Sequence, residues 1–291
     1  MQKLTIVTPS FQQGQFIERT IQSVLQQNYA NLEYLVFDGG STDQTIDILK
    51  KYDEHLQWVS QPDKGQADAV NKGITASSGD IIGWINSDDI YYPHAFTSVM
   101  QFFADNPQVN IVYGRADHID IFDKPFEEYP TELFNFERLM DVCFICQPSV
   151  FFRKSIFQQF GLLRADLNYC MDYEFWLRLA KNKVNFGHIP EKLAGSRFYP
   201  DTKTLGARKK VHYEINKMHK ETFGKVPTRW LINYAHVTLE NKLCRNKNPY
   251  RYIISLIIHS YWLSLYWNKS WDNNMYQIFL KARPRYDKHL K

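Results

Sequence analysis

The first third of the chain alternates short apolar runs with stretches in which apolar residues recur at helical spacing. Buried strands are predicted at the apolar runs 4–7, 34–37, 58–59 and 81–85. Helices are predicted between them at 16–25, 46–49 and 67–74. Strands that alternate with helices at this interval form right-handed crossovers, which build a parallel sheet with helices on both faces. The pattern therefore predicts an α/β fold.

Beyond residue 93 the pattern changes, and a second functional region is expected to begin. A helix is predicted at 95–103, a strand at 111–114, a loop-rich stretch through residue 130, a strand at 147–152 and a helix at 173–180. Asp172 stands at the start of the last of these helices, where the helix N-terminus favours a carboxylate.

The C-terminal stretch differs in composition from the rest. Residues 208–223 predict a basic amphipathic helix, and 229–267 are crowded with Trp, Tyr, Ile and Leu. The segment 252–267 contains no Lys, Arg, Asp or Glu, but it is shorter than the roughly 20 residues of a membrane span. Three interpretations stay open for it: a helix packed within the protein, a helix lying in a membrane interface, or a transmembrane helix.

The charge balance reverses along the chain, although the net charge is only +4. Residues 201–291 hold 18 Lys and Arg against 6 Asp and Glu, a balance of +12, and the residues before them hold 17 against 25, a balance of −8. The acidic part suits a metal site, and the basic, aromatic-rich tail suits anionic surfaces such as phospholipid headgroups or sugar phosphates. Nucleic acid is not expected as a partner.

Length and composition indicate a folded protein in a reducing compartment. With 291 residues and 44% hydrophobic content, the chain can form one sizeable core and a smaller appendage. The four cysteines are scattered, and the pair Cys143 and Cys146 has no second pair of zinc ligands nearby, so both are interpreted as packing cysteines. The N-terminus has neither the apolar region nor the cleavage site of a signal peptide. A cytoplasmic location is therefore expected, with the inner membrane face as an alternative.

Polar segments follow three of the predicted strands: 8–10, 38–43 and 86–89. In open parallel sheets the ligand lies at the carboxyl ends of the strands, so these segments predict an enzyme's substrate site. Asp88 and Asp89 place two carboxylates in one loop, which suits a divalent cation with oxygen ligands.

At these residues the chain resembles the family 2 glycosyltransferases, which are inverting enzymes of the GT-A fold. The resemblance covers roughly residues 3–205 and rests on the order and spacing of several motifs. These are Thr8-Pro9-Ser10-Phe11, Gln26-Gln27-Asn28-Tyr29 with Glu33, Asp38-Gly39-Gly40-Ser41-Thr42-Asp43, Asp63-Lys64-Gly65 with Asn71-Lys72-Gly73, Asn86-Ser87-Asp88-Asp89 and Met171-Asp172-Tyr173-Glu174-Phe175-Trp176. It implies a mostly parallel central sheet flanked by helices, with a nucleotide-binding half at 1–110, an acceptor-binding half at 111–205 and a helical extension at 206–291.

The resemblance also implies a donor site for a nucleotide-diphosphate sugar. The substrate-binding residues it implies are Thr8, Pro9, Ser10, Asp38, Gly65, Asn86, Ser87 and Arg197. Asp38 would accept a hydrogen bond from the base, which favours UDP and leaves GDP and dTDP open. Asp88 would hold Mn²⁺ or Mg²⁺, and Asn86 replaces the first Asp of the family's DxD motif. Arg197 or Lys203 would neutralise the diphosphate, since Tyr199 stands near the position where relatives often have a His.

Asp172 is the candidate general base. The resemblance aligns it with the second residue of the family's Glu-Asp motif, in which Met171 replaces the Glu. Glu174 lies two residues away and is the rival for this role. Trp84 and Trp176 could stack on a sugar ring, but aromatic residues at strand or helical spacing are more often part of the core.

Together these features predict an inverting, metal-dependent glycosyltransferase that acts on a glycan or lipid-linked acceptor in surface polysaccharide or glycolipid synthesis. Two alternatives stay open: a nucleotidyltransferase, which shares an acidic metal loop, and a non-catalytic sugar-nucleotide-binding protein. A dinucleotide oxidoreductase is not expected, because no G-x-G-x-x-G follows the first strand.

Overall fold

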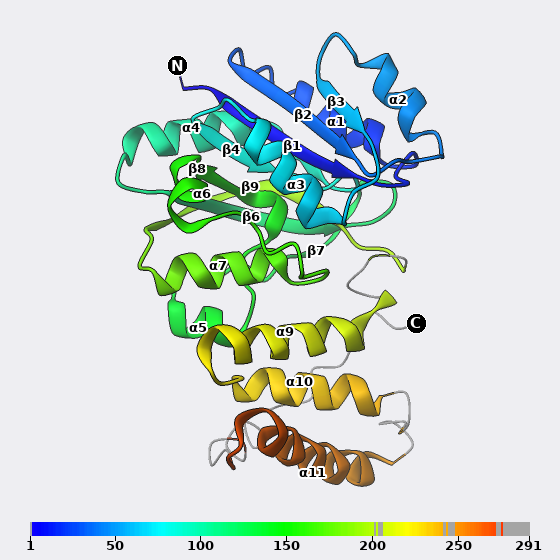
Figure 1. The fold of residues 1–291 in the computed structure, drawn as a ribbon, viewed down its shortest axis with the longest axis vertical. Helices are drawn as coiled ribbons and strands as arrows, with labels where there is room; N and C mark the ends of the chain where they lie inside the picture. Colours follow the sequence, from blue (N-terminus) through cyan, green and yellow to red (C-terminus); the bar gives the residue numbers. More distant parts are fainter. Residues whose placement is uncertain are drawn as a thin grey trace. The chain divides into compact units, whose positions relative to one another are not determined.

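The computed structural model describes residues 2–200, 202, 206–240, 243, 248–271 and 275. The chain divides into two compact units, Met1–Thr202 and Lys203–Lys291 (Figure 1). This division falls close to the end of the predicted catalytic region at residue 205.

The first half of the N-terminal unit is a parallel sheet with crossover helices. Its strands are β1 (Leu4–Ser10), β2 (Leu32–Asp38), β3 (Gln57–Ser60) and β4 (Ile81–Trp84), and its helices are α1 (Ile17–Leu25), α2 (Thr45–Lys51) and α3 (Gln66–Ala76). The strands lie in the order β3-β2-β1-β4, and all three pairings are parallel. The strands and helices predicted for this part of the chain are confirmed.

The second half of the unit extends this sheet with strands of mixed direction. Its elements are β5 (Ile90–Tyr91), α4 (Ala95–Asp105), β6 (Ile111–Ile119), β7 (Pro125–Glu128), α5 (Phe136–Asp141), η1 (Gln147–Ser149), β8 (Val150–Arg153), α6 (Ser155–Phe160), α7 (Met171–Lys181) and β9 (Phe186–Arg197). The sheet continues from β4 through β8, β6 and β9 to β5, and β7 pairs with β6. Strand β8 is antiparallel to both of its neighbours, so the parallel arrangement is restricted to the first strands and to the β6–β9 pair.

The strand predicted at 147–152 begins later than expected. Residues Gln147–Ser149 form a 3₁₀ turn, and the strand covers Val150–Arg153. Pro148 has no backbone N–H to donate to a neighbouring strand, which explains why the ladder starts only after it. The stretch predicted to be loop-rich contains the β6–β7 hairpin, and β9 was not predicted.

Helix α3 packs closely on strand β1. A Cβ atom at Gly73 would lie 2.3 Å from Cγ1 of Val7, so only a glycine lets the helix approach the strand this closely. Leu4, Ile6 and Val36 share one face of the first strands and are fully buried.

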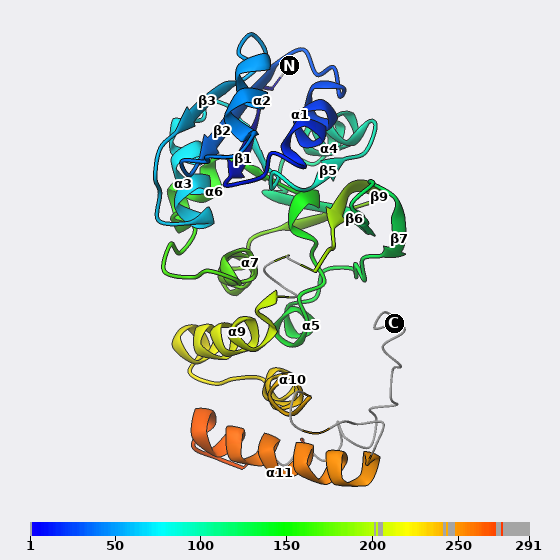
Figure 2. The same cartoon turned by 90° about the vertical axis from the view of Figure 1, so that its right-hand side faces the viewer.

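The C-terminal unit contains three described helices, α9 (Arg208–Phe223), α10 (Thr228–Leu239) and α11 (Pro249–Asn268). Helix α10 packs against both α9 and α11 (Figure 2). The basic helix predicted at 208–223 is confirmed, and Gly224 ends it in a left-handed conformation with φ of +73°. None of the described helices is both long enough and apolar enough to cross a membrane. Cys244 and Lys203 lie outside the described residues.

Candidate active site

The last residues of β1 lie beside the end of β2. Ser10 is the register partner of Asp38, and Thr8 Oγ1 lies 3.2 Å from the hydroxyl of Tyr34. Ser10 is buried, and its hydroxyl has no hydrogen-bond partner among the described residues. A buried hydroxyl without a partner costs free energy, so this position is suited to a hydrogen bond with a ligand or a water molecule.

Asp38 is buried and closes the turn that follows β2. Its Oδ2 accepts hydrogen bonds from Gly40 N at 3.0 Å, Ser41 N at 2.7 Å and Ser60 Oγ at 2.6 Å. Its Oδ1 accepts one bond, from Ser41 Oγ at 2.5 Å. Because a carboxylate oxygen has two lone-pair positions, Oδ1 can still accept a base N–H. The role of Asp38 in base recognition remains a prediction.

Gly65 caps the N-terminus of α3 with φ of +110° and ψ of 178°. This backbone region is open almost only to glycine. A Cβ atom there would meet nothing within 4 Å, so the backbone conformation, and not a lack of space, requires the glycine. The Gly65 N–H donates to Asp63 Oδ1 at 2.8 Å, which fixes the turn before the helix.

Asn86 connects the end of β4 with α3 and with Asp89. Its Oδ1 accepts bonds from Gln66 Nε2 at 2.6 Å and Trp84 Nε1 at 3.0 Å, and its Nδ2 donates to Asp89 Oδ2 at 3.3 Å. An aspartate at position 86 could not donate this last bond and would repel Asp89. The amide of Asn86 therefore makes a contact that the Asp expected there from the resemblance could not donate.

Asp88 and Asp89 differ in their surroundings. Asp89 is buried, and its Oδ1 accepts the Arg197 N–H at 2.8 Å. Burial and the neighbouring charge of Asp88 raise the pKa of Asp89 well above its ordinary value. Asp88 is partly exposed, and its Oδ2 accepts a bond from the Tyr199 hydroxyl at 3.1 Å. Burial and the charge of Asp88 raise the pKa of Tyr199, which keeps this hydroxyl a donor.

The loop of residues 86–89 is anchored to α1. Thr20 Oγ1 donates to the carbonyl oxygens of Ser87 at 3.0 Å and Asp89 at 2.7 Å. Ser87 itself is buried. The backbone that carries Asp88 is therefore fixed from the sheet and from the helix.

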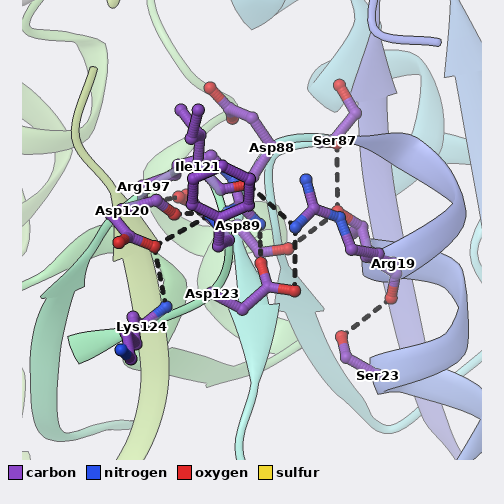
Figure 3. A network of polar contacts seen from close by, with 12 residues as sticks. Arg19, Ser23, Ser87, Asp88, Asp89, Asp120, Ile121, Asp123, Lys124 and Arg197 are labelled. Carbon is purple, nitrogen blue, oxygen red and sulfur yellow. Dashed lines mark hydrogen bonds and ion pairs between the residues drawn. The ribbon is translucent and has the colours of Figure 1, made fainter. Parts of the chain in front are cut away.

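Arg197, the last residue of β9, holds this loop from the other side (Figure 3). Its Nε donates to the Asp88 carbonyl oxygen at 2.6 Å, its Nη1 donates to the Asp120 carbonyl oxygen at 2.7 Å, and its Nη2 pairs with the Asp123 carboxylate. The guanidinium carbon lies 4.6 Å from the centre of the Phe16 ring, and the side chain is fully buried. All three nitrogens of the Arg197 side chain thus bind protein acceptors, and its contact with a diphosphate remains a prediction.

The β6–β7 turn is tied to α1 by a second arginine. Arg19 Nη1 donates to the Ile121 carbonyl oxygen at 2.9 Å and to Asp123 Oδ2 at 3.0 Å. Asp120 Oδ1 accepts the Lys124 N–H at 2.9 Å and closes the turn (Figure 3). Asp123 thus joins two arginines from elements far apart in the sequence.

Asp172 is the second residue of α7 and is partly exposed. Its negative charge acts on Cys146, whose pKa is raised first by burial and further by Asp89 and Asp172. The carboxylates of Asp89 and Asp172 are thus both close enough to this thiol to raise its pKa.

Glu174, the rival for the role of base, is buried and bound. Its two oxygens accept bonds from Arg178 at 2.9 Å and 3.1 Å, and Arg178 also donates to the carbonyl oxygen of Leu162 at 2.9 Å. Residues two positions apart point to opposite sides of a helix. Asp172 and Glu174 therefore have different surroundings, and Asp172 is the more accessible of the two.

Three further residues contact elements of the candidate site, and none of them was assigned a role from the sequence. Gln147 Nε2 donates to the Trp84 carbonyl oxygen at 2.7 Å, and its buried Oε1 has no partner among the described residues. Asn71 binds both backbone groups of Leu163 at 2.8 Å and 2.9 Å and so ties α3 to the segment before α7. Tyr199, noted only as a departure, binds Asp88. Trp84 and Trp176 are both core residues, so neither is placed to stack on a sugar.

The fold is similar to those of solved GT-A glycosyltransferases. A structure of S. aureus TarS 1–349 in complex with UDP-GlcNAc has a TM-score of 0.63 at 12% identity and covers 88% of this chain and 80% of that one. The mannosyltransferase PcManGT from Pyrobaculum calidifontis, in complex with GDP-Man and Mn²⁺, has a TM-score of 0.61 at 15% identity, with coverages of 96% and 79%. At these identities the likeness concerns the fold alone, and it confirms the predicted GT-A fold.

Sequence similarity identifies the family. The model of glycosyl transferase family 2 matches residues 5–161, more than half of the chain, which therefore belongs to this family of glycosyltransferases. An uncharacterized glycosyltransferase of Rickettsia typhi is 28% identical over 210 residues, which are 67% of this chain and 64% of that protein. One of Mycobacterium tuberculosis is 29% identical over 181 residues, 61% of this chain and 68% of that protein. The chain thus spans less than two thirds of the length of its Rickettsia typhi relative.

Proposed function

We propose that the protein transfers a sugar, with inversion, from a nucleotide-diphosphate donor to a hydroxyl of a glycan or lipid-linked acceptor. The observation that carries this proposal is a difference within two acidic pairs. Asp89 and Glu174 are buried in internal contacts, whereas Asp88 and Asp172 are partly exposed. A transferase of this kind needs one accessible carboxylate near the phosphates and a second at the acceptor, and the partial exposure of Asp88 and Asp172 supports assigning these roles to them.

The ends of β1 and β2 are the proposed nucleotide site. Ser10 Oγ and Asp38 Oδ1 both retain acceptor capacity beside each other, and Asp38 favours a base with an N–H donor such as uracil. The similar folds of TarS with UDP-GlcNAc and PcManGT with GDP-Man support a nucleotide-sugar donor. UDP is the preferred donor nucleotide, and GDP and dTDP are the alternatives to be tested.

Asp88 is the proposed ligand for Mn²⁺ or Mg²⁺. No group of three or more His, Cys, Asp or Glu side chains suited to a metal ion occurs within the described residues. One partly exposed carboxylate nevertheless fits such an ion, because Mg²⁺ is commonly held by one or two carboxylates together with substrate phosphates. The ion would supply positive charge that stabilises the leaving diphosphate.

Asp172 is the proposed base. Its carboxylate takes the proton of the acceptor hydroxyl while that oxygen attacks the anomeric carbon on the face opposite the diphosphate. The new C–O bond forms as the bond to the diphosphate oxygen breaks, and the nucleoside diphosphate leaves with that bond's electron pair. Single displacement inverts the anomeric centre. The acceptor belongs to surface polysaccharide or glycolipid synthesis in this proposal, with the enzyme on the cytoplasmic side of the membrane.

The test measures release of nucleoside diphosphate from UDP-, GDP- and dTDP-sugars with Mn²⁺ or with EDTA, and it counts slow hydrolysis as turnover. We expect metal-dependent release from one donor. Asp172→Asn should lower the rate by about 10²–10⁴-fold and leave donor binding, measured by calorimetry, unchanged.

Two further variants control for charge and for the rival base. Asp166→Asn removes an exposed carboxylate before α7 and should retain full activity. Glu174→Gln should retain the chemical step at a temperature where it is folded. Full activity of Asp172→Asn would remove this residue from the mechanism, and donor binding without any turnover would indicate a non-catalytic protein.

A further inference from the structure

Helix α11 carries an apolar face that is not covered by α9 or α10. The buried residues of the helix, which include Tyr252, Leu263 and Trp267, form its inner face. On the other side, large apolar side chains that are each more than half exposed recur at every fourth position: Tyr250, Ile254, Ile258, Trp262 and Tyr266. Residues spaced by four share one side of a helix, so these five form a continuous stripe, here called the α11 stripe.

A stripe of this size is unusual on a soluble surface. Scattered exposed apolar residues are normal, but contiguous apolar patches mark a binding surface. Between residues 252 and 267 no charged side chain interrupts the helix. The stripe is therefore a candidate binding surface, and three features indicate the chemistry of its partner.

The first feature is the kind of residue in the stripe. It combines aliphatic side chains, Ile254 and Ile258, with Trp262 and two tyrosines. Trp and Tyr rings are enriched at the headgroup level of membranes, where their apolar body lies in the acyl chains and their polar atom faces water.

The second feature is the charge around the stripe. Arg251 and Lys269 are exposed at its two ends, and residues 201–291 carry a balance of +12. Such a surface attracts anionic phospholipids, each nearby basic residue adding to the attraction. The net positive charge of the segment 201–291 also opposes the association of two copies.

The third feature is the inner face of α11, which is already used. It packs on α10, and Asn268 at the end of the helix exchanges two hydrogen bonds with the backbone of Val226, at 2.8 Å and 2.9 Å. A helix held on one side by its own protein can place only its other side in a bilayer surface. We propose that the α11 stripe docks the protein on an anionic phospholipid membrane, with the helix axis parallel to the bilayer plane. This proposal does not depend on transferase activity.

The test is sedimentation of the full chain with vesicles, in the absence of any sugar donor. Vesicles of phosphatidylcholine with phosphatidylglycerol are compared with vesicles of phosphatidylcholine alone. We expect the wild type to bind the anionic vesicles more strongly and to lose part of this binding in high salt. The double variant Ile258→Glu with Trp262→Glu should bind on the order of tenfold more weakly or not at all. Val59→Glu, at an exposed apolar position on β3, is the matched control and should bind as the wild type does.

A second double variant tests the proposal independently, in case the first one does not fold. Arg251→Glu with Lys269→Glu changes only exposed positions and should weaken binding to anionic vesicles while its circular dichroism stays that of the wild type. The proposal is overturned if the wild type stays in the supernatant with anionic vesicles, or if the Ile258 and Trp262 variant sediments as the wild type does. It is also overturned if light scattering shows a dimer that this variant dissociates, since the stripe would then join two copies.

Discussion

Replacing Arg197 with lysine separates two roles that the sequence cannot distinguish. A phosphate-binding cation would retain its charge in Arg197→Lys and would keep much of its function. An arginine whose role is to link protein segments would lose that function in Arg197→Lys. Its three guanidinium nitrogens bind three different acceptors: the carbonyl oxygens of Asp88 and Asp120 and the carboxylate of Asp123. One ammonium group cannot reach acceptors that diverge in this way.

The cost of the substitution can be worked out from these contacts. Lysine can keep one of the three bonds, so two are lost, and a hydrogen bond to a charged group contributes about 1.5–3 kcal/mol. Asp123 is partly exposed and can be rehydrated, which lowers the total to roughly 2–4 kcal/mol. For a unit of about 200 residues each kcal/mol lowers Tm by about 2–4 °C, so we expect a decrease of roughly 4–16 °C.

Scanning calorimetry of the full chain without donor measures this shift. Arg115→Lys is the matched control, because Arg115 forms an exposed pair with Glu128, and it should change stability by less than about 1 kcal/mol. A Tm of Arg197→Lys within 1 °C of the wild type would refute the structural role of Arg197. If the KM for the donor were raised as well, the result would favour a direct contact of Arg197 with phosphate.

Three further predictions concern backbone strain and pH. Gly65→Ala should cost about 1–3 kcal/mol because alanine rarely adopts φ of +110°, and a thermal melt would detect it. Burial alone would raise the pKa of Glu33, but hydrogen bonds from Ser78 and two other side chains outweigh it and hold this pKa at about 2. The pKa of Glu33 in the folded protein lies below the ordinary 4.5, so the ionised Glu33 stabilises the fold above pH 4.5, and this stabilisation is lost as the pH falls towards 2. In thermal melts, Glu33→Gln should therefore remove this part of the loss of stability in acid. Burial lowers the pKa of His212 and His219 from 6.5 to about 4. The C-terminal helices should therefore lose stability as the pH falls from 6.5 to 4. In circular dichroism melts, the double variant His212→Gln with His219→Gln should show a smaller change of Tm over this pH range.

The periodicity of apolar residues is sufficient to predict the strands and helices that pack against elements near them in the sequence. The strands and helices of the first part of the chain were predicted because each unit repeats strand, turn and helix over a short interval. Strand β9 was not predicted, since Phe186–Arg197 reads Phe-Gly-His-Ile-Pro-Glu-Lys-Leu-Ala-Gly-Ser-Arg and has no clear alternation. It pairs with β6, about 75 residues earlier, and such long-range pairing leaves no local signal.

In the candidate site, the surroundings of single side chains also depend on residues far away in the sequence. The sequence places Asp88 beside Asp89, and Asp172 two residues before Glu174, but it does not say which of each pair faces solvent. The Arg197 backbone, 108 residues from Asp89, covers one carboxylate, and Arg178 covers Glu174. The internal contacts of Arg197 could not be predicted for the same reason, because its acceptors come from the loop of residues 86–89 and the β6–β7 turn.

The departures from the family pattern become consistent with one another in the folded protein. Asn86 replaces a carboxylate, and its amide donates to Asp89, which a second carboxylate could not do. Met171, which is buried at the start of α7, also stands in place of a carboxylate and leaves Asp172 as the one acidic residue of the Glu-Asp pair. Tyr199 stays protonated and donates to Asp88. The replacements by Asn86 and Met171 each remove a carboxylate from a site proposed to receive a diphosphate, so repulsion of the donor decreases while Asp88 remains to hold a cation. The cation would then depend on the donor's own phosphates for its remaining oxygen ligands, which links metal binding to donor binding in this chain.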